Sequence, residues 1–168
     1  MRVFIIGYMG AGKSTVGKRL ANNLDIPFVD LDDAFEARFR YSIPRFFDHF
    51  GEKRFREFEH QCLKEIIGEH EEAVISTGGG TACFNNNISL MNKEGITVYI
   101  KMHPKSLAHR LKRARRLRPV VRDIQNDGMQ NFVEEQLAER ESFYEQAKVT
   151  VKGESLDMVE LIEALKRV

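Results

Sequence analysis

Short apolar runs alternate along this chain with longer amphipathic stretches, and the two patterns predict different elements. The apolar runs predict buried strands at residues 2–6, 28–30, 73–76, 96–101 and 149–151. The amphipathic stretches predict helices at residues 13–24, 33–39, 42–50, 53–69 and 155–168, with a further helix around Arg140. Strands separated by helices of this length predict the α/β class, with a parallel sheet and helices on both of its faces.

Apolar stripes identify the buried faces of two predicted helices. In the helix at 53–69 the stripe consists of Phe55, Phe58, Cys62, Ile66 and Ile67. In the last helix the side chains expected to face inward are Leu156, Val159, Ile162 and Leu165. Ser42 is expected to cap the helix that follows it. Because no repeat and no Pro/Ser-rich linker interrupts the pattern, we expect one domain spanning residues 1–168.

The composition narrows the class of function. Of 168 residues, 42% are hydrophobic and 30% are charged, which is typical of a globular protein. The 26 Lys and Arg residues nearly balance the 25 Asp and Glu residues, so no overall field favours nucleic acid or an anionic membrane. The first apolar run is too short for a membrane span or an export signal, so we expect a cytoplasmic protein. Cys62 and Cys83 lack the spacing of a metal or redox site, and we expect free thiols.

Residues 7–14 match the phosphate-loop pattern G-x-x-x-x-G-K-[ST], directly after a predicted strand and before a predicted helix. Glycines let the backbone N–H groups turn toward a phosphate, and the following helix N-terminus attracts the same anion. A glycine-rich turn without a ligand is the alternative, and a complete match in this context argues against it. We expect ATP to contact Gly10, Ala11, Gly12, Lys13, Ser14 and Thr15.

Three of these loop residues have distinct expected roles. Lys13 would place a cation between the β- and γ-phosphates of ATP. The Ser14 hydroxyl is a hard oxygen ligand of the kind that Mg²⁺ prefers. Thr15 would help to fix the loop or the start of the helix. The loop therefore predicts that Mg²⁺ and ATP bind together.

Two carboxylates, Asp30 and Asp32, follow the second predicted strand, at the edge where open α/β sheets bind ligands. If the strand geometry continues to Asp32, both side chains point the same way. One carboxylate would then reach the hydrated Mg²⁺, and the other would meet the group that accepts the phosphate. The alternative is that Asp32 or Asp33 only caps the next helix. Asp33 is assigned to capping or to the surface.

Arginines and glycines further along the chain indicate an anionic substrate. Arg56 and Glu59 lie three apart on one predicted helix, so the carboxylate can orient the guanidinium toward a substrate carboxylate. A surface ion pair is the alternative. Residues 78–80 are three successive glycines after a strand, which suggests backbone N–H groups bare against a ligand. Arg118 lies in a stretch, residues 95–122, that contains no acidic residue, and Arg140 lies on a helix flanked by acids.

In this order and spacing, the motifs resemble the shikimate kinase family from Val3 to about residue 151. The resemblance implies a three-layer, nucleoside-monophosphate-kinase-like fold with a five-stranded parallel sheet in the order 2-3-1-4-5. It implies a substrate-binding region at about residues 31–60 and a mobile lid at about residues 110–125. The implied activity is transfer of phosphate from ATP, with Mg²⁺, to the 3-hydroxyl of shikimate, on the route to chorismate and the aromatic amino acids.

The resemblance also implies a role for each motif residue in the acceptor site. Asp32 would contact the ring hydroxyls of shikimate, including the one that attacks. Glu59 would hold Arg56 in place. The residues that would contact the carboxylate and ring are Arg56, Gly78, Gly79, Gly80 and Arg140.

On the nucleotide side, the resemblance implies that Ser14 and Asp30 hold Mg²⁺, Asp30 through water. Arg118 would be the lid arginine that closes onto the phosphates, so Lys13, Asp32 and Arg118 would be the catalytic residues. A second arginine upstream of the lid would also serve ATP. Arg110 is the nearest candidate, with Lys112 and Arg113 as alternatives. The adenine would lie near residues 152–155.

Two other classes of function remain as alternatives. Another P-loop kinase, for gluconate or a nucleotide, shares the loop and lid but does not predict Arg56, the glycine triplet and Arg140 together. A nucleotide-dependent switch predicts a large partner surface, of which the sequence shows no sign.

The shikimate kinase family usually has two leucines where this chain has Val120 and Val121, a conservative departure.

The same residues limit the partners that we expect. The basic residues between 101 and 122 have no aromatic residues interleaved for base stacking, so we expect no nucleic-acid partner. The five histidines form no metal-ligand or triad arrangement and are assigned to the surface or to packing. We expect a monomer without a membrane partner.

Overall fold

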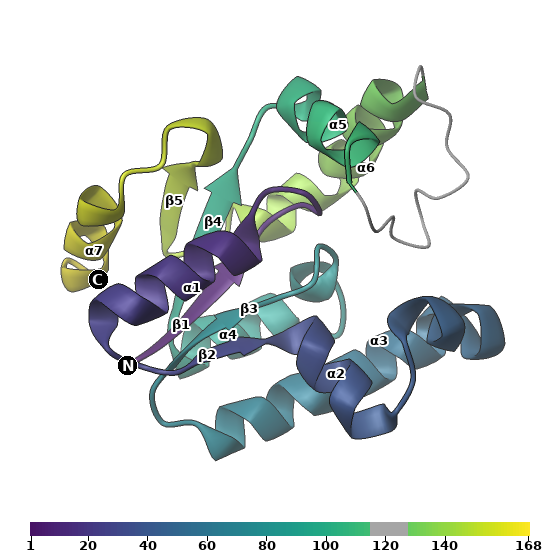
Figure 1. Ribbon diagram of the computed structural model, residues 1–168, viewed down its shortest axis with the longest axis horizontal. Coiled ribbons are helices and arrows are strands. Elements are labelled where there is room, and N and C mark those ends of the chain that lie inside the picture. The colour runs from purple at the N-terminus through teal and green to yellow at the C-terminus, as the bar shows by residue number, and fades with distance from the viewer. Residues whose placement is uncertain (115–127) are drawn as a thin grey trace.

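A five-stranded parallel sheet forms the centre of the computed structural model, which describes residues 1–114 and 128–168 (Figure 1). Its strands are β1 (Arg2–Ile6), β2 (Phe28–Asp30), β3 (Ala73–Ser76), β4 (Ile96–Lys101) and β5 (Val149–Lys152). The order is β2-β3-β1-β4-β5, and every neighbouring pair is parallel. The predicted strand positions and strand order are therefore confirmed.

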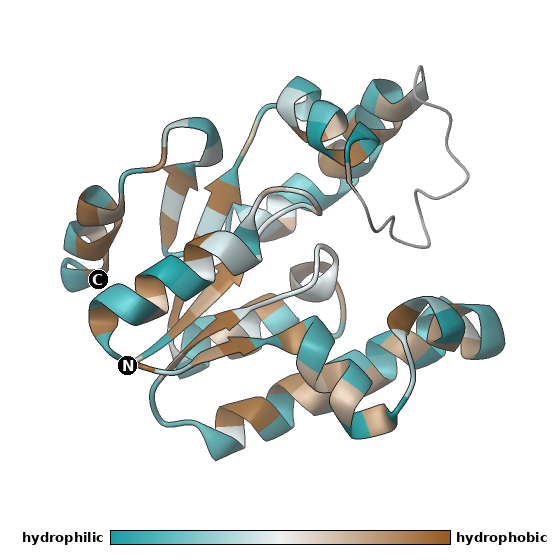
Figure 2. Cartoon of the chain, in the orientation of Figure 1, coloured by the Kyte–Doolittle hydropathy of each residue, from teal (hydrophilic) through white to brown (hydrophobic). Residues whose placement is uncertain are grey.

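Helices cover both faces of this sheet, with α1 in front of it and α4 behind it in Figure 1. The helices are α1 (Lys13–Leu24), α2 (Leu31–Phe39), α3 (Ile43–Glu69), α4 (Asn87–Glu94), α5 (Pro104–Lys112), α6 (Met129–Tyr144) and α7 (Met158–Lys166). Two short 3-10 turns, Thr81–Cys83 and Gly153–Ser155, follow β3 and β5. Apolar residues lie along the strands and the helix faces that pack on them (Figure 2). The sequence predicts no helix at α4, a short and mostly polar element.

The parallel strands bring three sequence motifs to one edge of the sheet. Ser76, the last residue of β3, is in register with Asp30 of β2 on one side and with Ile5 of β1 on the other. The phosphate loop leaves β1 at the same edge, because all three strands run in the same direction. This carboxyl edge is where open α/β sheets bind ligands.

Helix α3 contains a break that the sequence predicts as a boundary between two helices. Gly51 has φ 78° and ψ 172°, outside the helical region, between the predicted helices at 42–50 and 53–69. A Cβ on Gly51 would meet nothing within 4 Å, so glycine is required here for its backbone conformation rather than for space. The side chain of Ser42 accepts a hydrogen bond from the N–H of Arg45 at 3.4 Å, which confirms the predicted cap.

The last helix differs from its prediction at its start and on its buried face. It begins at Met158, not at residue 155, because the carboxylate of Asp157 caps it by accepting from the N–H groups of Val159 and Glu160. The expectation that Val159 faces inward is wrong, since this side chain is 71% exposed. The buried stripe instead runs through Met158, Leu161 and Leu165, which lie three and four residues apart on one face.

Candidate active site

The phosphate loop has the backbone conformation that its motif predicts. Gly7, Gly10 and Gly12 have φ values of 144°, 80° and 87°, which L side chains rarely adopt. A Cβ on Gly7 would also lie 2.9 Å from the carbonyl oxygen of Ile100. Gly12 precedes α1 and has no side chain with which to cap it. No N-cap side chain therefore competes with an anion for the first N–H groups of α1.

Hard oxygen donors meet beside this loop. The Ser14 hydroxyl donates a hydrogen bond to Oδ2 of Asp30 at 2.5 Å, and the Ser76 hydroxyl oxygen lies 3.3 Å from that of Ser14. In the described part of the chain, no group of three or more His, Cys, Asp or Glu side chains is arranged to hold a metal by itself. The Ser14 and Asp30 oxygens fit Mg²⁺ when phosphate and water supply its other ligands.

Asp30, and not Asp32 or Asp33, caps the helix after β2. Its Oδ1 accepts hydrogen bonds from the N–H groups of Asp32 and Asp33 at 3.0 and 3.3 Å. The strand geometry does not continue to Asp32, which lies in the first turn of α2, so the condition for the two side chains to point the same way is not met. Asp33 is exposed in that turn, in agreement with its assignment to the surface.

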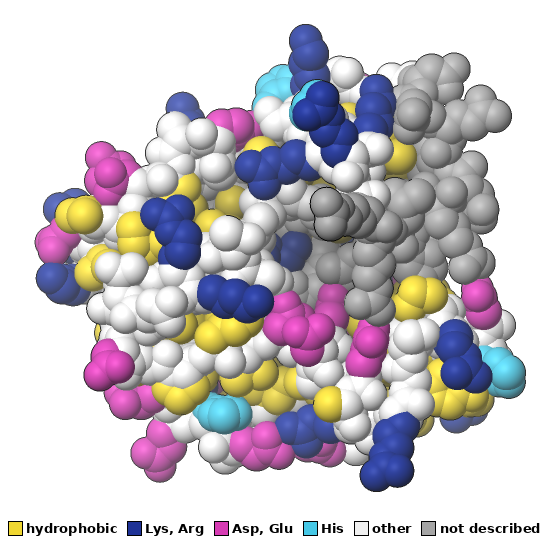
Figure 3. Space-filling model, viewed as in Figure 1, with side chains coloured by type: hydrophobic (Ala, Val, Ile, Leu, Met, Phe, Trp, Pro, Cys, Tyr) yellow, Lys and Arg dark blue, Asp and Glu magenta, His cyan; other side chains and the backbone are white. Residues whose placement is uncertain are grey.

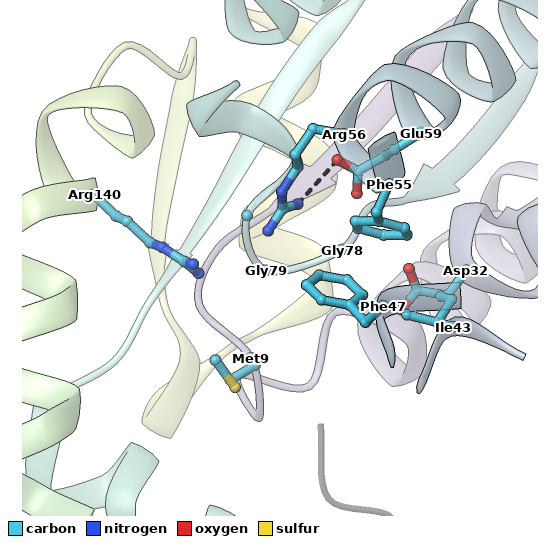
Figure 4. A pocket seen from close by; sticks show the side chains of 11 residues that line it. Met9, Asp32, Ile43, Phe47, Phe55, Arg56, Glu59, Gly78, Gly79 and Arg140 are labelled. Carbon is cyan, nitrogen blue, oxygen red and sulfur yellow. Dashed lines mark hydrogen bonds and ion pairs between the residues drawn. The ribbon is translucent and has the colours of Figure 1, made fainter. Parts of the chain in front are cut away.

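A cavity next to the phosphate loop is lined by two buried arginines, and we call it the two-arginine cavity (Figure 4). Arg56 from α3 and Arg140 from α6 are each 8% exposed, and in Figure 4 both point toward the space beside Gly79. The residues that line this cavity are Met9, Asp32, Ile43, Phe47, Phe55, Arg56, Glu59, Gly78, Gly79, Gly80 and Arg140. Two convergent guanidinium groups in a partly apolar cavity suit the carboxylate of a small ring compound.

Glu59 holds Arg56 from within the protein interior. Its Oε1 accepts from a terminal nitrogen of Arg56 at 3.0 Å, and its Oε2 accepts from the hydroxyl of Thr81 at 2.8 Å. The Glu59 side chain is only 2% exposed, so this is a buried pair and not a surface ion pair. Burial raises the pKa of Glu59, and the Arg56 guanidinium opposes that shift. Arg56 Nε is buried and has no hydrogen-bond partner among residues 1–114 and 128–168, so one donor of this guanidinium is unsatisfied by them.

The glycine triplet is needed for the space that it leaves for Arg56, and not for an unusual backbone conformation. None of these glycines has a positive φ, in contrast to those of the phosphate loop. A Cβ on Gly80 would lie 2.4 Å from a terminal nitrogen of Arg56, and one on Gly79 would lie 2.9 Å from the backbone nitrogen of Met9. Gly78 to Gly80 thus allow β3, α3 and the phosphate loop to approach closely.

One residue belongs to both cavities. Asp32 lines the two-arginine cavity and also the cavity around the phosphate loop, whose other lining residues are Gly10, Gly12, Lys13, Ser14, Thr15, Asp30 and Thr77. Lys13 is 6% exposed, and its ammonium group donates to the carbonyl oxygen of Tyr8 at 2.9 Å. Asp32 therefore borders both the phosphate-loop cavity and the two-arginine cavity.

Charge is divided between the two sides of the site. The surface over α5 is rich in Lys and Arg, whereas the surface over α2 is rich in Asp and Glu (Figure 3). A cationic side favours the phosphates of a nucleotide, and an acidic side favours a cation and hydroxyl groups.

Comparisons with known proteins agree with this geometry. The family described as shikimate kinase matches residues 9–166. A shikimate kinase from Bacteroides fragilis is 43% identical over 157 residues, which cover 94% of this chain and 87% of that protein. The chain belongs to the shikimate kinase family. It is accordingly a kinase that uses ATP as its co-substrate.

Solved structures of shikimate kinases have the same fold. The enzyme from Bacteroides thetaiotaomicron is 40% identical, with a TM-score of 0.87 over 99% of this chain and 95% of that chain. The enzyme from Acinetobacter baumannii in complex with shikimate is 28% identical, with a TM-score of 0.82 over 99% of this chain and 90% of that chain. A gluconokinase from Sinorhizobium meliloti, at 16% identity and a TM-score of 0.55, is similar in fold alone.

Two of the three remaining residues that are candidates for binding ATP lie within the described part of this shikimate kinase family member. A terminal nitrogen of Arg110 donates to the carbonyl oxygen of Gly10 at 3.4 Å, so this arginine reaches the phosphate loop. Thr15 is exposed on α1. Arg118 lies within residues 115–127, outside the described residues.

Sequence reasoning missed several side chains that complete the site. Met9, Ile43, Phe47 and Phe55 line the two-arginine cavity. Their apolar character predicts burial, but nothing in the sequence indicates which buried residues face a cavity. Nothing in the sequence assigns a role to Tyr144, yet its buried hydroxyl donates to the carbonyl oxygen of Gly79.

Proposed function

We propose that this chain transfers the γ-phosphate of ATP to the 3-hydroxyl of shikimate, giving shikimate 3-phosphate for the synthesis of chorismate and the aromatic amino acids. The observation that carries the proposal is the position of Asp32, which lines both the phosphate-loop cavity and the two-arginine cavity. A hydroxyl group bound there would lie between the carboxylate of Asp32 and the phosphates.

Shikimate would be held by its carboxylate and its ring. Arg56, oriented by Glu59, and Arg140 would bind the carboxylate from two sides. Gly78, Gly79 and Gly80 form the wall against which the ring would lie. Asp32 would orient the attacking hydroxyl and take its proton.

ATP would be bound by the phosphate loop, through the N–H groups of residues 10–15 and the ammonium of Lys13. Mg²⁺, held by Ser14 and through water by Asp30, would reduce the charge on the phosphates. Arg110 would contribute a further cation from α5. Arg118, the candidate lid arginine, would complete the charge around the transferred phosphate.

We also propose that residues 1–168 act as a single domain, with a substrate-binding region at about 31–60 and a lid at about 110–125. We expect a cytoplasmic monomer that does not bind nucleic acid. None of the described helices is long and apolar enough to cross a membrane.

An ADP-release assay tests the proposed substrate directly. Purified protein with ATP and Mg²⁺ should release ADP when shikimate is added. Gluconate and nucleoside monophosphates serve as the competing acceptors, and they should give no more ADP than ATP alone. No increase in ADP release on addition of shikimate, or an increase with gluconate instead, would contradict the proposal.

A further inference from the structure

One face of α6 contacts both loops that form the two-arginine cavity. Gln136, Arg140 and Tyr144 are spaced four residues apart, so they lie on the same side of the helix. Oε1 of Gln136 accepts a hydrogen bond from the hydroxyl of Tyr8 in the phosphate loop at 2.5 Å. Tyr144 contacts Gly79 in the glycine triplet. Arg140 lies between these two contacts and lines the cavity.

Tyr8 contacts this face of α6 in two ways. Its hydroxyl binds Gln136, and the guanidinium carbon of Arg140 lies 5.9 Å from the centre of its ring. This separation is within the range of about 6 Å over which a cation is attracted to an aromatic face. Tyr8 is 1% exposed, and neither Tyr8 nor Gln136 lines the two-arginine cavity. The side chain of Tyr8 therefore contacts the cavity residue Arg140 without lining the cavity itself, and Gln136 contacts Tyr8.

We propose that Tyr8 and Gln136 are positioning residues that hold the Arg140 guanidinium in the orientation that receives the substrate carboxylate. The inference rests on the carboxylate-binding role proposed above for Arg140. An arginine side chain has several rotatable bonds, so an arginine held in place loses less entropy when it binds. The hydroxyl of Tyr8 fixes the ring against α6, and the ring face then restricts Arg140.

The phenol of Tyr8 is suited to this role over a wide pH range. Burial raises the pKa of Tyr8 to about 12, and the charge of Arg140 opposes that shift. The hydroxyl therefore remains a hydrogen-bond donor throughout the neutral range. Its backbone carbonyl separately accepts from Lys13, a contact that a change of side chain leaves in place.

Calorimetric titration of shikimate into the nucleotide-free full chain tests the inference, because the protein has no tryptophan to report binding. Tyr8→Phe keeps the ring and removes the hydroxyl, and Gln136→Leu removes the acceptor. We expect each to weaken shikimate binding about threefold to tenfold, as for loss of one hydrogen bond. The KM for shikimate should rise equally, while kcat and the KM for ATP stay within about twofold of their original values.

A double-mutant cycle separates this contact from general effects on folding. Because the two side chains form one hydrogen bond, the doubly substituted protein should bind shikimate about as well as either single variant. Tyr99→Phe and Gln61→Leu are the matched controls. The first removes a hydroxyl from the ring that stacks on Tyr144, and the second removes an exposed amide that bonds Glu65, so neither should change the affinity.

Three outcomes would overturn the inference. The first is unchanged shikimate affinity in Tyr8→Phe and Gln136→Leu. The second is additive losses in the double variant, and the third is an equal loss of ATP affinity. Arg140→Ala distinguishes this failure from failure of the proposed function. If Arg140→Ala weakens shikimate binding but the other variants do not, only the positioning role is wrong. If Arg140→Ala has no effect, the proposed carboxylate site is wrong as well.

Discussion

At the scale of single residues, the site depends on carboxylates that perform different tasks. Asp30 caps α2 and meets Ser14, Asp32 lies between the two cavities, and Glu59 supports Arg56. Their surroundings differ accordingly. Glu59 is buried against a guanidinium, whereas Asp32 lies at the surface of both cavities. These differences allow each role to be tested by a single substitution.

Asp32→Asn should remove turnover and leave ATP binding in place. The amide cannot take a proton from the acceptor hydroxyl, so we expect kcat to fall by about 10²- to 10⁴-fold. Steady-state kinetics and a separate titration with ATP measure the two effects. Asp33→Asn, a change at the exposed neighbouring carboxylate, is the control and should retain full activity. Loss of ATP binding in Asp32→Asn, or normal turnover, would remove Asp32 from the acceptor site.

Glu59→Gln should weaken shikimate binding through Arg56. The amide keeps the size of the side chain but removes the charge that orients the guanidinium, so we expect the KM for shikimate to rise about tenfold. Glu65→Gln, on the same helix, breaks a pair with Arg38 in which both side chains are partly exposed, and should leave the KM unchanged. Equal KM values for the two variants would show that the buried pair does not orient Arg56.

At the scale of elements, the turn after β3 packs closely against one side chain from α3 and one from α6. The guanidinium of Arg56 lies against Gly80, and the hydroxyl of Tyr144 reaches Gly79. Small shifts of either helix would therefore change the shape of the two-arginine cavity.

Gly80→Ala should displace Arg56. Because the new Cβ would lie 2.4 Å from a guanidinium nitrogen, the arginine must move, and we expect the KM for shikimate to rise about tenfold or more. Gly68→Ala is the matched control, since a Cβ there meets nothing within 4 Å. That change should leave the kinetics unaltered and raise the stability of α3 by about 0.5–1 kcal/mol in thermal unfolding. Normal shikimate kinetics in Gly80→Ala would contradict the proposed geometry.

The sequence predicts elements whose signals are local. The strands are continuous apolar runs, the phosphate loop is a contiguous motif, and Ser42 caps the residues next to it. Contacts between distant segments are different. The bond from Tyr8 to Gln136 joins residues 128 positions apart, and it depends on how α6 packs rather than on any local pattern.

The points that the sequence leaves wrong or open have the same physical origin. Val159 is expected to face inward because it fits an apolar repeat that starts at Leu156, whereas the Asp157 cap sets the true start of α7 at Met158. The sequence leaves open whether the strand continues to Asp32, and in the structure Asp30 accepts the N–H of Asp32 and begins a helix. In both cases a capping carboxylate decided the backbone conformation.

At the scale of the whole molecule, two helical units face each other across the carboxyl edge of the sheet. Helices α2 and α3 lie on one side, and α5 and α6 lie on the other (Figure 1). The candidate lid, at about residues 110–125, begins at the end of α5 on the cationic side. Most of this segment falls outside the described residues, so its role remains a prediction from the family resemblance.

Arg118→Ala tests that prediction. If Arg118 completes the positive charge around the transferred phosphate, its loss should lower kcat on the order of 10³-fold. Lys105→Ala, which removes an exposed cation from the first turn of α5, offers a comparison of charge loss alone. The measurement is steady-state ADP release with saturating shikimate and ATP. A fall of less than about threefold would show that Arg118 is not the catalytic lid arginine.

The two oxygens of Asp30 perform separate tasks, since Oδ1 accepts from the backbone of α2 and Oδ2 accepts from Ser14. A single carboxyl group therefore connects the start of the helix that carries Asp32 with the candidate ion site. Alanine at this position would remove both hydrogen bonds, so loss of the cation could not be told apart from fraying of α2. Asparagine can keep its amide oxygen toward the helix while its NH₂ group replaces the oxygen toward Ser14. This variant therefore separates the capping of α2 from the contact at the candidate ion site. The Mg²⁺ requirement of Asp30→Asn, read beside its thermal stability, would thus report on the ion alone.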